Sequence, residues 1–122
     1  MLNPTISNGL KAACTATLLS IAVSNTPASA ASLYYFKGPT KAPNERVCLN
    51  FAGDQASRHN LQNIKKDNLG VAGTRGDLYA AMTCVGTVVV VMVTGDGAAN
   101  GSPLAQELFD AVRGEICMDA CN

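Results

Sequence analysis

The chain has 122 residues, of which 48% are hydrophobic, and this length suits a single domain. Nine basic and nine acidic residues give a net charge of zero. No field of one sign exists to attract nucleic acid or an anionic membrane surface, so neither is an expected partner.

The first thirty residues have the pattern of an export signal. Lys11 precedes an apolar run, Ala12 to Val23, and Ala28-Ser29-Ala30 then has the small-x-small pattern that a signal peptidase recognises. The run falls short of the roughly 20 apolar residues that a membrane-spanning helix needs. We therefore expect residues 1–30, with Cys14, to be removed on export to the periplasm or the medium. No membrane association is expected after cleavage.

Residues 31–43 are expected to form an N-terminal arm in front of a single small domain, residues 44–122. The arm contains Tyr34-Tyr35-Phe36, followed by Gly38-Pro39. The aromatic side chains either dock on the core or form an exposed patch for a partner, and the sequence leaves both interpretations open.

A first helix is predicted from Asn44 to about His59. Asn44 is a good N-cap residue, and Glu45 places a negative charge in the first turn, where it suits the helix dipole. Helical spacing of apolar residues then continues on one face. Residues 61–65 follow as a weak strand candidate, and residues 66–70 contain turn formers.

Two clearer strands follow a hairpin signal at residues 73–77. Residues 78–85 alternate between two faces. Residues 87–94 form a β-branched run without polar alternation, which indicates a strand buried on both faces or a covered central strand.

A second helix is predicted from Ser102 as N-cap and Pro103 as first helical residue. Its apolar stripe consists of Leu104, Leu108, Val112 and Ile116. The expected fold is an α+β two-layer domain, in which an antiparallel meander of two or three strands is covered on one face by two helices.

Candidate catalytic groups are sparse. His59 is the single histidine, and it could serve a small hydrolase, with the carboxylates Asp54 and Asp67 as a variant of that site. Ser57, two residues away, would not face His59 on a helix. We assign no catalytic residue and no cofactor.

Metal sites are equally weak candidates. His59, Cys84, Cys117 and Cys121 could in principle bind zinc, but the export signal and the even cysteine count favour oxidation. Residues 96–101 lack the closing Glu of a calcium loop. Arg75-Gly76-Asp77 matches the integrin tripeptide, but a hairpin turn needs the same residue types. We assign no metal ligand.

Four cysteines would remain after cleavage: Cys48, Cys84, Cys117 and Cys121. An even number in a small exported chain indicates two disulfides, and three pairings are possible. Because Cys117 and Cys121 form C-x₃-C rather than the C-x-x-C of thioredoxin-like enzymes, redox catalysis is a weak alternative.

Several motifs together resemble a set of small exported bacterial proteins of unknown function. They are Gly-x-Arg-Gly-Asp at residues 73–77, Ala-Ala-Met-Thr-Cys at 80–84 and Val-Thr-Gly-Asp at 93–96, between a helix with an early cysteine and a Leu-rich helix. The resemblance covers most of the mature chain and implies a fold and a compartment, but no activity.

The resemblance includes Cys48 and Cys84 without the other two cysteines, so it favours Cys48–Cys84 and Cys117–Cys121. Geometry argues against the first pair: in a plain meander the first helix runs parallel to the second strand, which places these cysteines at opposite ends. Cys84 bonded to a C-terminal cysteine is the alternative.

The function predicted is therefore that of an exported, non-enzymatic binding or structural domain, with the hydrolase centred on His59 as the alternative. Its binding surface would be the sheet face opposite the helices or an edge strand, which can pair with a partner strand. An unknown protein is the possible partner, and the oligomeric state is not predicted.

Overall fold

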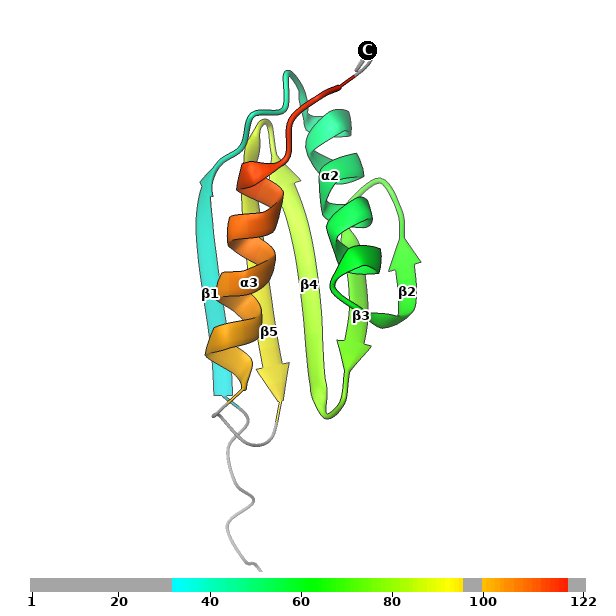
Figure 1. Cartoon of the computed structure of the whole chain (residues 1–122), viewed down its shortest axis with the longest axis vertical. Coiled ribbons are helices and arrows are strands. Elements are labelled where there is room, and N and C mark those ends of the chain that lie inside the picture. Colours follow the sequence, from blue (N-terminus) through cyan, green and yellow to red (C-terminus); the bar gives the residue numbers. More distant parts are fainter. Residues whose placement is uncertain (1–31, 96–99, 119–122) are drawn as a thin grey trace, which may run out of the picture.

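The computed structural model describes residues 32–95 and 100–118, which form a five-stranded sheet and two helices (Figure 1). In chain order the elements are β1 (Ser32–Pro39), α2 (Glu45–Arg58), β2 (Gln62–Lys66), β3 (Val71–Arg75), β4 (Leu78–Val85), β5 (Val88–Gly95) and α3 (Gly101–Gly114). The predicted signal peptide, residues 1–30, lies outside the described residues.

The sheet has the strand order β1-β5-β4-β3-β2, and every neighbouring pair is antiparallel. The α+β class is confirmed, but the predicted number of two or three strands is wrong. Residues 32–39, expected as part of an arm, pair along their full length with β5. The segments on either side of residues 67–70 form two strands, β2 and β3.

The turn between β2 and β3 is built by Asp67. Its carboxylate accepts hydrogen bonds from the backbone N–H groups of Leu69 and Gly70, at 2.7 and 3.0 Å. The Asp67 N–H donates to the Gly70 carbonyl at 3.0 Å. This side chain closes a hairpin whose first strand, Gln62–Lys66, is exposed throughout and therefore carries no alternating hydrophobic signal.

The two later hairpins turn at glycine. Gly76 and Gly86 have φ of 60° and 61°, and each is the first residue of a two-residue loop. A positive φ at that position favours Gly. The hairpin predicted at residues 73–77 is thus confirmed.

Both helices cover the same face of the sheet, α3 over β1 and β5 and α2 mainly over β4 and β3 (Figure 1). The core lies between the layers. Its fully buried side chains include Val89, Val91 and Val93 of β5, Met82 of β4, and Leu104 and Leu108 of α3.

The helix ends agree only in part with the predictions. Asn44 caps α2 as expected, and its side chain accepts a hydrogen bond from the Val47 N–H at 3.0 Å. Helix α3 begins at Gly101 instead of Pro103, and the Asn100 side chain makes no capping hydrogen bond. Because α3 ends at Gly114, Ile116 leaves the predicted stripe and is 52% exposed.

Cys48 and Cys84 form a disulfide with a Cα–Cα distance of 6.2 Å. The predicted geometric conflict disappears because two strands, β2 and β3, separate α2 from β4. Each reversal inverts the chain direction, so β4 runs antiparallel to α2 (Figure 1). The first turn of α2 and the last residues of β4 therefore lie at the same end, where Gly86 N–H also donates to the Glu45 carboxylate at 2.8 Å.

Candidate functional site

The most distinctive surface is the sheet face opposite the helices, which we call the open face. In an antiparallel sheet, directly paired residues share a face. Four rows of paired residues form it: Leu33, Thr94, Tyr79, Thr74 and Gln62; Tyr35, Met92, Ala81, Ala72 and Lys65; Lys37, Val90 and Thr83; and Pro39, Val88 and Val85. Among the residues that the structure describes, no helix lies over this face (Figure 1).

The open face is largely apolar and accessible to solvent. Leu33, Tyr35, Tyr79 and Val85 expose 63, 62, 50 and 69% of their surface. Leu69, in the β2–β3 turn, is 72% exposed beside the same face. Contiguous exposed apolar surface is a candidate for an interaction site on a soluble domain, so the open face is the candidate site.

The sequence predicted that strand β5 is buried on both faces or is a covered central strand, and it lies inside the sheet between β1 and β4. Val89, Val91 and Val93 are fully buried under the helices. Val88, Val90 and Met92 point to the open face and remain partly exposed. The strand therefore has the composition of a doubly covered strand, while the described residues cover it on one face.

The charged side chains on the strands of the open face have one sign. The described strands contain no Asp or Glu, and the charged side chains in the open-face rows are Lys37 of β1 and Lys65 of β2. These strands are the two edges of the sheet. An apolar centre is thus bordered by a positive charge on either side.

A shallow hollow of about 320 Å³ lies on the open face beside the β2–β3 turn. Leu69 and Tyr79 form part of its walls, together with Ala72, Ala81 and Met92, and the charged residues Lys65 and Asp67 also line it. The small alanine side chains leave space that a protruding apolar side chain of a partner could fill.

The two edges of the sheet differ. β2 has five residues, its pairing with β3 shifts register between Gln62 and Lys65, and Asn63 has a φ of 53°. Such irregularity and the adjacent Lys65 and Lys66 discourage pairing with another strand. β1 pairs in unbroken register over eight residues.

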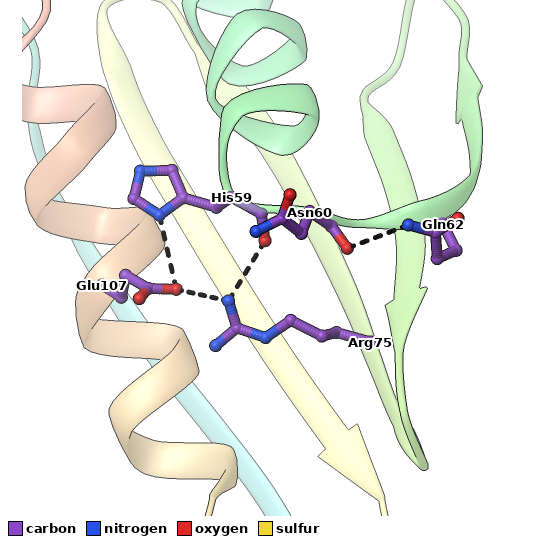
Figure 2. A network of polar contacts seen from close by, with 5 residues as sticks. All are labelled: His59, Asn60, Gln62, Arg75 and Glu107. Carbon is purple, nitrogen blue, oxygen red and sulfur yellow. Dashed lines mark hydrogen bonds and ion pairs between the residues drawn. The ribbon is translucent and has the colours of Figure 1, made fainter.

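His59 belongs to a polar network at the end of α2 (Figure 2). Its Nδ1 lies 3.4 Å from Oε2 of Glu107 on α3, and that same oxygen lies 2.7 Å from an Arg75 guanidinium nitrogen. Arg75 also donates to the His59 carbonyl at 3.1 Å. The network links α2, β3 and α3. Within it, the His59 ring contacts the Glu107 carboxylate and not a hydroxyl or thiol group that could act as a nucleophile.

The structure does not unite Asp54 and Asp67, the other carboxylates considered for a hydrolase. Asp67 holds the β2–β3 turn. Asp54 lies beside Glu115, and both line a hollow of about 570 Å³ between α2 and the segment after α3. Glu115 was not among the residues considered from sequence. The two carboxyl groups are 61 residues apart in sequence, and only packing of the helices brings them together.

Burial, followed by the charge of Asp54 and a hydrogen bond with it, raises the pKa of Glu115 above its ordinary value, while Arg58 and Gln55 partly oppose this effect. Oε2 of Glu115 is buried and has no hydrogen-bond partner among the described residues. Paired carboxyls in a hollow are the elements of acid–base chemistry, although structural pairs also perturb pKa values.

The zinc ligands considered from sequence do not come together. Cys84 is oxidised with Cys48, and His59 lies near Glu107, at the other end of α2. No group of three potential metal-binding side chains occurs within residues 32–95 and 100–118. Cys117 is disulfide-bonded, but Cys121 lies outside the described residues, and the pairing of these two stays a prediction.

Most of the segment considered for calcium, residues 96–99, also lies outside the described residues. The Cys48–Cys84 disulfide indicates an oxidising compartment, as expected of an exported protein. The described part of the chain contains no helix of the length and hydrophobicity that crossing a bilayer requires.

Comparison with known proteins adds no assignment: no protein-family model, no curated protein and no solved structure matches this chain. The resemblance to small exported proteins therefore stays an expectation from sequence, and the function has to be argued from the surfaces of the molecule.

Proposed function

We propose that this protein is an exported, non-enzymatic binding domain of the periplasm or cell envelope, and that its open face holds a partner protein. The observation that carries the proposal is the apolar surface of β5 and β4 that the described residues leave uncovered. Val88, Val90 and Met92 are as hydrophobic as the β5 residues buried in the core. A partner that covers them would remove apolar surface from water, at about 25 cal/mol per Å².

The chemistry of this face specifies the partner. Lys37 and Lys65 border the apolar centre, and the described strands carry no carboxylate. The complementary partner is a protein whose binding surface has an apolar centre and an acidic border. The hollow beside Tyr79 accepts one protruding apolar side chain of that partner.

Photo-crosslinking in the producing cells tests the proposal. A photoreactive phenylalanine analogue at Tyr79 should form an adduct with one protein, identified by mass spectrometry. The same analogue at Ser57, exposed on α2, is the matched control and should not form that adduct. Lys37→Glu with Lys65→Glu should reduce the Tyr79 adduct at least several-fold, because the partner's border is acidic.

Equal adducts from Tyr79 and Ser57, or none from Tyr79, would overturn the open face as the binding surface. An adduct from Tyr79 that is unaffected by the two Lys→Glu changes would refute the acidic border. Circular dichroism of each variant establishes that the fold is retained.

A hydrolase remains the second candidate, with its site moved to Asp54 and Glu115. The observation in favour is the raised pKa of Glu115 beside a second carboxyl on the hollow between α2 and the segment after α3. The protein would then hydrolyse members of a panel of model esters, peptides or glycosides, and Glu115→Gln would abolish the turnover while leaving the fold intact. No turnover above the buffer rate would eliminate this candidate.

A further inference from the structure

Among the residues that the structure describes, the β1 edge of the sheet has a regular array of backbone groups without a partner strand. In an antiparallel pair, alternate residues direct their N–H and C=O groups toward the partner strand. Thr40, directly after β1, donates its N–H to the Thr87 carbonyl at 2.9 Å, so the even-numbered residues face β5. The backbone groups of Leu33, Tyr35 and Lys37 therefore point away from the sheet.

Pro39 fits this assignment. Proline has no N–H to contribute, and it occupies an outward position, where the ladder to β5 loses nothing. Its carbonyl is already used, because Nε of Arg113 donates to it at 3.1 Å. The free part of the edge thus runs from Leu33 to Lys37 and stops at a proline.

We propose that a second copy of this chain pairs with β1, antiparallel, with Tyr35 opposite Tyr35 of the second copy. Leu33 then lies opposite Lys37 of the second copy, and the three outward residues of each strand exchange about six N–H···O hydrogen bonds across the dyad. The two five-stranded sheets become one sheet of ten strands.

Charge and hydrogen bonding select this register over its neighbours. Centring the dyad on Lys37 would place two like charges opposite each other and would pair Tyr35 with Pro39, which has no N–H to donate. Moving the dyad by one residue, to Tyr34 or to Phe36, leaves two of these three outward pairs. With Tyr35 at the centre, two aromatic rings face each other on the open face, an arrangement favoured across strands.

The helix layer accommodates the pairing. Helix α3 lies over β1 and β5 together, and neighbouring strands are about 4.8 Å apart. A second α3 related by the dyad would lie about 10 Å away, the distance at which helices normally pack. The open faces of the two copies would also become continuous, with Leu33 and Tyr35 at their junction.

Disulfide trapping tests both the pairing and its register on the protein purified as the cell produces it. Directly paired residues have a Cα–Cα distance of about 5.5 Å, within the range of a disulfide. Tyr35→Cys should therefore form a covalent dimer under mild oxidation, at least tenfold faster than Tyr79→Cys, an exposed control on the same face. Leu33→Cys alone should not, whereas Leu33→Cys mixed with Lys37→Cys should.

Sedimentation of the unmodified protein gives the second measurement. A dimer should be present at high micromolar concentration, and Tyr35→Pro, which removes one outward N–H, should weaken it at least tenfold without lowering the melting temperature of the monomer. A monomer at all concentrations, or equal trapping of Tyr35→Cys and Tyr79→Cys, would overturn the proposal. Both experiments use the isolated protein, so their outcome is independent of the partner proposed for the open face.

Discussion

Along β5 the two faces of the sheet are both hydrophobic, but their surroundings differ. On the helix side, Val89, Val91 and Val93 are fully buried. On the open side, Val88, Val90 and Met92 are partly exposed, and Tyr79 and Val85 are at least half exposed. A hydrophobic strand sequence therefore does not by itself show how many faces of the strand the same chain covers.

Polar side chains also divide between the faces. The helix side carries the His59–Arg75–Glu107 network and the Asp54–Glu115 pair, whereas the open-face rows carry two lysines and no carboxylate. Interactions that hold the layers together therefore belong to the helix side. Substitutions on this side should change stability, and substitutions on the open face should change binding.

A matched pair of Asp substitutions on β5 tests most directly whether the two faces of the sheet differ in burial. Val91→Asp would bury an unpaired carboxylate in the core and should cost more than about 4 kcal/mol, enough to prevent folding. Val90→Asp, one residue away on the open face, should cost less than about 1 kcal/mol. Urea unfolding of both variants makes the measurement, and similar losses for the two would mean that the open face is covered within the chain.

The helix stripe provides the second test. Leu108→Ala should lower the free energy of unfolding by about 2–5 kcal/mol, because Leu108 is fully buried. Ile116→Ala, in the same sequence pattern but beyond the end of α3, should cost less than about 0.5 kcal/mol. Equal effects in thermal or urea melts would contradict the position at which α3 ends.

The disulfide joins the helix layer to the sheet, and its removal should come next in size. Cys48→Ala with Cys84→Ala should cost about 2–4 kcal/mol, mainly because the unfolded chain gains freedom. Mass spectrometry of non-reduced peptides should find Cys48 linked to Cys84. A Cys84 peptide linked to a C-terminal cysteine would refute this pairing, and a loss below about 1 kcal/mol would show that the bridge is not a stabilising link.

The smallest effect concerns the carboxyl pair on the helix side. Folding raises the pKa of Glu115 above its value in the unfolded chain, near 4.5. The protonated carboxyl therefore stabilises the folded state fully below the unfolded pKa, and this stabilisation is lost as the pH rises through the folded pKa. Glu115→Gln should therefore stabilise the protein at pH 7.5, by no more than about 1 kcal/mol, and change little at pH 4. Urea melts at both pH values make the test, and a variant that is less stable at pH 7.5 would contradict it.

Sequence patterns predicted the elements that have strong local signals. The cap at Asn44, the hairpin at Gly76 and the buried stripe of Leu104 and Leu108 all follow from interactions within a few residues. Strand β1 was missed because Gly38-Pro39 has the composition of a linker, and β2 gave only a weak strand signal at residues 61–65 because its side chains are all exposed. Both are edge strands, and their pairing with a neighbouring strand, up to 63 residues away in the case of Ser32 and Gly95, is specified by backbone hydrogen bonds instead of by a local side-chain pattern.

The candidate sites also divide into those with a local sequence signal and those formed by residues far apart in sequence. The open face was among the surfaces considered from sequence, because the alternation of residues 78–85 between two faces is a local feature. The partners of His59 and Asp54 were not foreseen: Glu107 and Glu115 reach them only after α3 packs against α2. The two residues of each pair are too far apart in sequence to form a recognisable motif.

The amino-acid sequence by itself determined the α+β class, the two helices, the central strands and a cysteine content suited to an oxidising compartment, because propensity, periodicity and composition act locally. The tertiary structure decided the number of strands, the end of the sheet at which each element lies and the face that stays uncovered. The disulfide shows the physical reason. One additional chain reversal between α2 and β4 changes Cys48 and Cys84 from opposite ends of the sheet to neighbours 6.2 Å apart between their Cα atoms.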